Sequence, residues 1–319
     1  MRENIIGESI AVPNFEAVGS NLLATNVSSQ GDPMMRFSCS QLVIERLDPL
    51  VNPGVVPSPH LHQVDFSELL DCRHVLPRPN RTYKRVNQFA SIGLAANGGI
   101  TVYYIPAPGA GVDVTTLKPG FRMLVGDAIL RTPPQTAAKV CHRCIASTET
   151  DNSNVNCDAP ESAAFPTGFC AGGIRSVLTF PTCWDGVNLD SPNHESHVSY
   201  PIEGNENDAL GAYGTCPSTH PVKIPRVMFE VMWDTHGSQP FVWSTGDKEG
   251  YTQHADYVFG WQDAALQRAM DSRACNGSTC AGVLRAQSDE EAMNCTVARV
   301  VDEPIDGWLA ALAGNDILS

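Results

Sequence analysis

Nine histidines are the first candidates for chemistry in this chain of 319 residues, because several stand beside Pro, Asp, Ser or Tyr rather than inside apolar runs. Imidazole titrates near neutral pH and is a common metal ligand. His60 and His62 lie two residues apart in the string PHLH, so an extended backbone projects both side chains from one face. The pair predicts a shared metal ion or sugar; two surface histidines at a strand end are the alternative.

A second concentration of polar groups is the string CWDGVNLDSPNHESH. It combines an indole with carboxylates and imidazoles. Such a set could hold a divalent ion, or could supply a general acid and base while the indole stacks on a sugar ring. Histidines that only order the loop through hydrogen bonds are the alternative. The candidate residues here are Trp184, Asp185, Asp190, His194 and His197.

Later segments add further candidates. His220 precedes an apolar run that ends at Asp234, and the string QHADY places His254 and Asp256 on one face if it is extended. The candidate catalytic residues are His60, His62, Asp185, Asp190, His194, His197, His220, Asp234 and His254. The candidate substrate contacts are Trp184, Tyr251 and Asp256, and the candidate ligands of a divalent metal are His60, His62, His194 and His197.

No familiar motif identifies a reaction. The chain lacks a Walker loop, a His-Glu-x-x-His pair, an EF-hand loop and a Gly-x-Ser-x-Gly nucleophile elbow. Its formal net charge of −14 repels phosphate backbones, and it has no apolar run of the roughly 18 residues that a membrane helix needs. We therefore expect neither a nucleic-acid partner nor a membrane span.

The elements that must position these side chains are short. Apolar segments rich in β-branched and aromatic residues alternate with Pro and Gly, which predicts a mainly β chain. Helical signals are confined to residues 262–270 and 289–293. We expect one β-sandwich or jelly-roll-like domain over residues 31–310 with long disulfide-braced loops, a disordered leader at 1–30 and a tail at 311–319. The expected strands cover residues 35–44, 100–105, 121–125, 174–180, 227–233 and 240–244.

Eleven cysteines and four glycosylation sequons indicate an oxidising compartment. The dispersed cysteines favour disulfides, although the spacing of Cys141 and Cys144 also fits a redox or half-zinc motif. The first thirty residues lack the basic start and apolar run of a signal peptide, yet the cysteines lead us to expect an extracellular or cell-wall location. N-glycans are expected on the sequons that begin at Asn26, Asn80, Asn276 and Asn294.

Six strings carry a family resemblance: RFSCSQLVIERLDPLVNPGVVPSPHLHQV, NGGITVYYIPAP, LKPGFRMLVGD, TFPTCWDGVNLDSPNHESHVSYP, CPSTHPVKIPRVMFEVMWDT and FVWSTGDKEGYTQHADYVFGW. In this order they resemble DUF1996, a family of secreted fungal proteins of unestablished function that often occur beside carbohydrate-binding WSC modules. The resemblance implies an extracellular role at polysaccharide or cell wall, and it supplies no catalytic assignment. The histidines of its strings correspond to His60, His62, His194, His197, His220 and His254.

One segment departs from this resemblance. Between Ser67 and Asn80 the chain reads ELLDCRHVLPRP, where relatives carry an aromatic stretch, although both flanks match. Codons for the expected residues, read one base early, encode the observed Glu68 to Arg73. We therefore hypothesise that residues 68–79 are frame-shifted, which also accounts for Cys72 as the odd cysteine. Transcript sequencing that finds the segment in frame would contradict this hypothesis.

Two functional hypotheses remain open. The first is a carbohydrate-active enzyme, a hydrolase, lyase or oxidase that acts on cell-wall polysaccharide through a histidine- and aspartate-rich cleft with an optional divalent metal. The second is a non-catalytic cell-wall or glycan-binding structural glycoprotein. The two differ in geometry, because convergent histidines favour catalysis or metal binding and scattered histidines favour a scaffold.

Overall fold

The computed structural model describes residues 4–5, 9–10, 35–66, 100–106, 113–134, 139–145, 157, 161–202, 214–233, 241–261, 264–272, 275–276, 279–280, 282–284 and 297–305. Within these residues the protein is mainly β, with a single short helix. The predicted fold class is confirmed. Among the same residues, no helix has the length and apolar character needed to cross a membrane.

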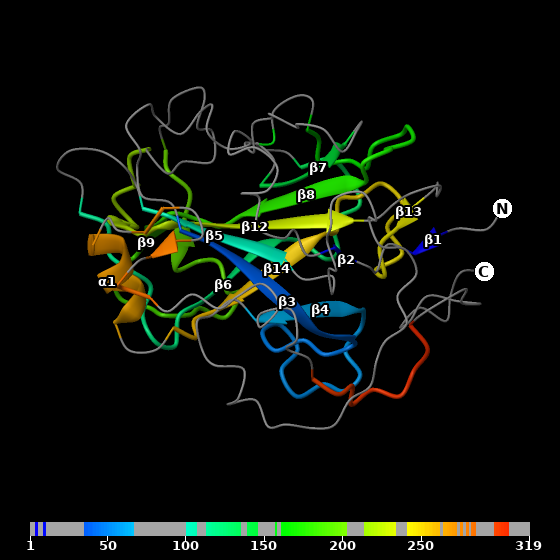
Figure 1. The fold of residues 1–319 in the computed structure, drawn as a ribbon, viewed down its shortest axis with the longest axis horizontal. Helices are drawn as coiled ribbons and strands as arrows, with labels where there is room; N and C mark the ends of the chain where they lie inside the picture. The colour runs from blue at the N-terminus through cyan, green and yellow to red at the C-terminus, as the bar shows by residue number, and fades with distance from the viewer. Residues whose placement is uncertain are drawn as a thin grey trace.

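A seven-stranded antiparallel sheet crosses the centre of the protein (Figure 1). Six strands follow the order β4-β3-β5-β12-β8-β7, and β2 pairs with β12. The central strand β12 has neighbours on both sides, so that Phe229 lies opposite Val102 and also opposite Leu178. The strands are β2 (Ser9–Ile10), β3 (Met35–Glu45), β4 (His62–Phe66), β5 (Ile100–Ile105), β7 (Val140–Cys144), β8 (Ile174–Thr179) and β12 (Arg226–Trp233).

Both faces of this sheet are covered. In β5, Val102 and Tyr104 belong to the larger apolar cluster on one face, while Tyr103 and Ile105 belong to a smaller cluster on the other. A strand that is buried on both faces has no polar side to show, so its sequence is a continuous apolar run. This explains why the string ITVYYI lacks the strict alternation of a half-exposed strand.

A second sheet packs on the larger cluster. It pairs β6 (Arg122–Gly126) with β14 (His254–Val258), and Met123, Val125 and Tyr257 enter the core. The Tyr104 hydroxyl donates to that of Tyr257 across the interface at 3.2 Å. Because side chains alternate along a strand, the other face of β14 carries His254 and Asp256 away from this core.

The remaining elements are small. Helix α1 (Ala265–Ser272) buries Leu266, Ala269 and Met270 against the core, where an amphipathic helix must place its apolar stripe. The short strands are β1 (Asn4–Ile5), β9 (Cys183–Trp184), β10 (Val198–Ser199), β11 (Val222–Lys223), β13 (Phe241–Val242), β15 (Cys275–Asn276) and β16 (Thr279–Cys280). They pair as β1-β13, β10-β9-β11 and β15-β16.

Disulfides brace the edge of the central sheet. Cys141 and Cys144 of β7 do not pair with each other: Cys141 bonds to Cys157 and Cys144 to Cys170. A third disulfide joins Cys183 to Cys216. The Cys-x-x-Cys spacing is therefore structural, and neither the redox nor the half-zinc interpretation applies.

The sequence expectations for the main strands are confirmed with boundary shifts of one or two residues. The helix predicted at residues 262–270 is α1, which lies slightly later. The second predicted helix, at residues 289–293, and the suspected frame-shifted residues 68–79 lie outside the described residues. So do the sequons at Asn26, Asn80 and Asn294 and the expected tail at 311–319. Of the expected disordered leader at 1–30, residues 4–5 and 9–10 are described, and they form the short strands β1 and β2.

Candidate functional site

Three imidazoles meet beside the outer face of β14. His60 precedes β4, His62 begins β4, and His254 begins β14. The Nε2 atoms of His60 and His254 are 3.2 Å apart, and the ring centroids of His60 and His62 are 4.4 Å apart. One ring nitrogen from each histidine lies within 4.8 Å of the other two. We refer to His60, His62 and His254 as the histidine cluster.

Two hydrogen-bonded loops hold the cluster in place. The backbone N–H of Leu61 donates to the Ser244 hydroxyl at 3.2 Å, which ties the segment carrying His60 and His62 to the loop before His254. Within that loop, Asp247 Oδ2 accepts the N–H of Thr252 at 2.9 Å. The carbonyl of Thr252 in turn accepts Nδ1–H of His254 at 3.0 Å. The orientation of the His254 ring is therefore fixed by its own loop.

Gly126 allows β6 and β14 to approach each other closely beside His254. It lies opposite His254 in the register of β6 and β14, with φ at 89°. A Cβ on this residue would lie 2.7 Å from the Cα of His254, which no real contact tolerates. Glycine is required here by the left-handed backbone and by the close approach of the neighbouring strand.

Asp48 stands beside His62 and is firmly held. Its Oδ1 accepts the N–H groups of Leu50 and Val51 at 3.0 and 2.8 Å, and its Oδ2 accepts the Asn52 amide at 2.9 Å. Oδ2 is 3.7 Å from Nε2 of His62. Burial alone would raise the pKa of Asp48, but these hydrogen bonds and the nearby His62 outweigh burial and lower it. Asp48 is therefore a preorganised anion at the edge of the cluster.

Asp256 is a second carboxyl at the same edge. It lies two residues after His254, so both side chains share one face of β14. Burial raises the pKa of Asp256 to about 6, and a hydrogen bond with Asp48 acts in the same direction. Its Oδ1 is buried without a hydrogen-bond partner among the described residues. The site thus holds two adjacent carboxyl groups with opposite pKa shifts.

The imidazoles of His60 and His62 are uncharged near neutral pH. Burial lowers the pKa of His60 to about 3, helped by the repulsion of His62 and His254. Burial likewise lowers the pKa of His62 to about 4, although Asp48 partly opposes this shift. A neutral imidazole offers one lone pair, and lone pairs that converge can bind a cation.

Two other predicted histidines, His194 and His197, lie in residues 183–197, which we call the polar loop. Both have hydrogen-bond partners within or near this loop. His194 donates Nδ1–H to Oδ1 of Asp190 at 2.6 Å, and its φ of 56° is a left-handed conformation that few non-glycine residues adopt. His197 is buried, with Nε2 on the Arg122 carbonyl and Nδ1 on the Ser191 hydroxyl. The predicted ligand set of His60, His62, His194 and His197 therefore does not assemble: only its first two members join, and His254 completes the group.

The hydrogen bonds of Asp185 and His220 connect these residues to other parts of the chain rather than to the histidine cluster. Asp185 caps the turn that follows it, accepting the N–H groups of Val187 and Asn188. His220 bonds through its two nitrogens to Thr219 and to the Ser196 carbonyl. Asp234 lies outside the described residues.

The predicted aromatic platforms differ in exposure. Trp184 is only 3% exposed: the edge of Phe121 packs on it, and the Lys118 ammonium lies 4.8 Å from the ring centroid. A sugar could stack on this indole only if those side chains moved away. Tyr251 is half-buried in the loop before His254.

Sequence reasoning missed Asp48. The string LDPLVN was the only sequence pattern that pointed to Asp48. An Asp at this position can accept hydrogen bonds from the residues two to four positions later, which is typical of an Asx turn. That pattern predicts a turn and says nothing about a histidine fourteen residues later. The contact with His62 depends on how the loop folds back over β4.

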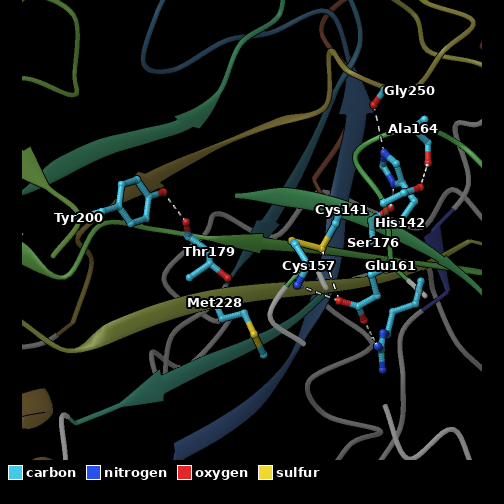
Figure 2. Close-up of a disulfide and its surroundings, with 12 residues drawn as sticks. Cys141, His142, Cys157, Glu161, Ala164, Ser176, Thr179, Tyr200, Met228 and Gly250 are labelled. Carbon is cyan, nitrogen blue, oxygen red and sulfur yellow. Dashed lines mark hydrogen bonds and ion pairs between the residues drawn. A yellow bond between two sulfur atoms is a disulfide. The ribbon is translucent and has the colours of Figure 1, made fainter. Parts of the chain in front are cut away.

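A second set of ligating side chains, Cys141, Cys157 and Glu161, lies near the braced edge of the sheet. Figure 2 shows that both sulfur atoms are joined in a disulfide and that Glu161 is bonded to Cys157. Glu161 accepts the Cys157 N–H and a further hydrogen bond from Arg175. Disulfide sulfurs are not thiolates, so this set cannot bind a metal while it is oxidised.

Comparison with known proteins adds the family. No curated protein and no solved structure matches the chain. Residues 74–261 match the family described as "Domain of unknown function (DUF1996)", and the matched segment contains His254, Asp256 and the whole polar loop. This segment covers more than half of the 319 residues, so the chain belongs to the DUF1996 family.

Proposed function

We propose that this protein is a secreted, carbohydrate-active enzyme that acts on cell-wall polysaccharide, with the histidine cluster as its reactive centre. The observation that carries the proposal is the convergence of His60, His62 and His254 from two segments that are far apart in the chain. A scaffold gains little from this arrangement, because burial costs the imidazoles their hydration while Nε2 of His62 gains no hydrogen-bond partner among the described residues.

Two further features support this setting. Three disulfides are typical of proteins from oxidising compartments, which favours a secreted protein. The centre also places imidazole nitrogens next to the carboxyl groups of Asp48 and Asp256. Such groups can hydrogen-bond to sugar hydroxyls and hold them beside the reactive nitrogens.

The test is an activity screen on cell-wall polysaccharides. The secreted protein is incubated with β-glucan, chitin, mannan, xylan and cellulose, and soluble products are analysed by mass spectrometry. New reducing ends identify a hydrolase, unsaturated ends a lyase and oxidised ends an oxidase. We expect one product class with the wild type and at least a tenfold lower yield with His60→Ala/His62→Ala, given that such groups contribute roughly 10²–10⁴-fold to catalysis.

The matched control is His220→Ala, which removes a histidine whose nitrogens are bonded elsewhere. Its product yield should equal that of the wild type. Polysaccharide binding that is unchanged in the double variant, without product from either protein, would contradict the proposal and favour the non-catalytic glycoprotein.

A further inference from the structure

The spacing of the cluster nitrogens matches a metal site. Bonds of about 2.0–2.1 Å at a tetrahedral angle separate two ligand nitrogens by about 3.3 Å. The Nε2 atoms of His60 and His254 are 3.2 Å apart. In the metal-free protein a proton on Nε2 of His60 can bridge this gap as a hydrogen bond to Nε2 of His254, and a divalent ion that replaces this proton can be shared by both nitrogens.

The outer hydrogen bonds of the rings leave a lone pair on Nε2 of His254 and on Nε2 of His62. His254 uses Nδ1–H to donate to the Thr252 carbonyl, so its Nε2 carries the lone pair. The Ser58 hydroxyl donates to the His60 carbonyl, so its contact of 3.4 Å with Nδ1 of His62 has the ring as donor. Nε2 of His62 is buried and has no hydrogen-bond partner among the described residues. Backbone and hydroxyl partners on the far ring nitrogen are the usual outer shell of a metal-binding histidine.

The charges of the site also suit a cation. Two carboxyl groups lie at its edge, and Oδ2 of Asp48 is 3.7 Å from Nε2 of His62. No lysine or arginine forms an ion pair with Asp48 or Asp256 among the described residues. A bound divalent ion would supply the missing positive charge and would give the buried Oδ1 of Asp256 a partner.

We propose that His60, His62 and His254 bind one divalent first-row transition-metal ion through their ring nitrogens, with Asp48 and Asp256 as the neighbouring anionic groups. Imidazole ligands favour zinc, copper, iron or nickel, whereas magnesium and calcium prefer oxygen ligands. Three protein nitrogens leave a further coordination position for water or a substrate oxygen, as in catalytic zinc sites. As the reactive centre of an enzyme the site rests on the proposed function, but ion binding can be measured without any polysaccharide.

The experiment starts from secreted full-length protein that has been stripped with a chelator and dialysed. Zn²⁺, Cu²⁺, Mn²⁺ and Ca²⁺ are titrated in separate calorimetric runs. We expect one Zn²⁺ or Cu²⁺ per chain and no saturable binding of Ca²⁺. His62→Ala and His254→Ala should each weaken Zn²⁺ binding by on the order of a hundredfold or more, while His220→Ala should leave it unchanged.

A spectroscopic measurement on the unmodified protein guards against variants that fail to fold. In the Cu²⁺-loaded wild type, electron paramagnetic resonance should resolve coupling to three imidazole nitrogens, and His254→Gln should reduce the number to two. Absence of stoichiometric Zn²⁺ or Cu²⁺ binding to the wild type, or a spectrum without imidazole coupling, would overturn the proposal. Stoichiometric binding without any polysaccharide product would instead contradict only the proposed function.

Discussion

The histidine cluster and the three histidines His142, His197 and His220 use the same side chain in opposite ways. We call the latter the bracing histidines. His142 is buried against Phe165 and Trp243. Its Nδ1 is on the Ser176 hydroxyl at 2.8 Å and its Nε2 on the Gly250 carbonyl at 3.0 Å (Figure 2).

Every ring nitrogen of the bracing histidines has a protein partner. In the cluster, nitrogens point at one another instead, and Nε2 of His62 has no hydrogen-bond partner among the described residues. The difference teaches that burial alone does not identify a functional histidine. Imidazole nitrogens bonded to carbonyls and hydroxyls hold loops together, whereas imidazole nitrogens that converge on one another are available to a ligand.

The largest expected effect comes from removing a bracing histidine. His142→Ala removes a hydrogen-bond partner of Ser176 and of Gly250 and opens a cavity beside two aromatic rings, so it should lower the free energy of unfolding by about 3 kcal/mol. His62→Ala should lower it by less than about 1 kcal/mol in metal-free protein, because the lost ring has one long hydrogen bond, to the Ser58 hydroxyl at 3.4 Å, and an unpartnered Nε2. Urea denaturation in the presence of a chelator measures both. Equal losses would remove the distinction between the two groups.

A pH series sharpens the same comparison. Burial lowers the pKa of His142 from 6.5 to about 4, so between these values the unfolded chain binds a proton that the folded chain does not. The contribution to stability is complete above pH 6.5 and decreases as the pH falls towards 4, by up to about 3 kcal/mol.

The variant His142→Gln isolates this contribution, since glutamine keeps a donor for the Gly250 carbonyl without titrating. The difference in unfolding free energy between wild type and variant should shrink as the pH decreases from 7 to 4.5. A difference that is constant with pH would show that His142 does not exclude the proton.

The smallest expected effect belongs to His220, the bracing histidine nearest the surface. Its partners are Thr219, its chain neighbour, and one carbonyl of the polar loop. His220→Ala should change the free energy of unfolding by less than about 0.5 kcal/mol, which thermal and urea denaturation can bound. If His220→Ala lowered the free energy of unfolding as much as His142→Ala, the exposure of a bracing histidine would not determine how much its hydrogen bonds stabilise the fold.

The strands could be predicted because their signal is local. The string ITVYYI is apolar or β-branched throughout, and IRSVLT is so apart from Arg175 and Ser176. Gly and Pro residues nearby mark the ends of both segments. The cysteine partners could not be predicted, since Cys141 and Cys144 bond to residues 16 and 26 positions away, on opposite sides of a loop.

The candidate site could be predicted only in part, because some of its contacts are local in the sequence and others join distant segments. The spacing of His60 and His62 is a local property, and it correctly indicated a shared direction. That His254 rather than His194 completes the group depends on how two sheets pack. The burial of Trp184 also escaped prediction, because an aromatic residue beside polar ones can face either the core or the solvent.

The contact between His60 and His254 spans 194 positions of the chain, and this has a consequence for biosynthesis. Closing so long a loop is entropically costly and occurs only with the packing of the sheets, so a partly synthesised chain cannot offer the complete nitrogen set. Any ion that binds to all three histidines must therefore be acquired after translation has passed residue 254. The identity of the ion is then set by the compartment in which folding finishes rather than by the one in which synthesis begins.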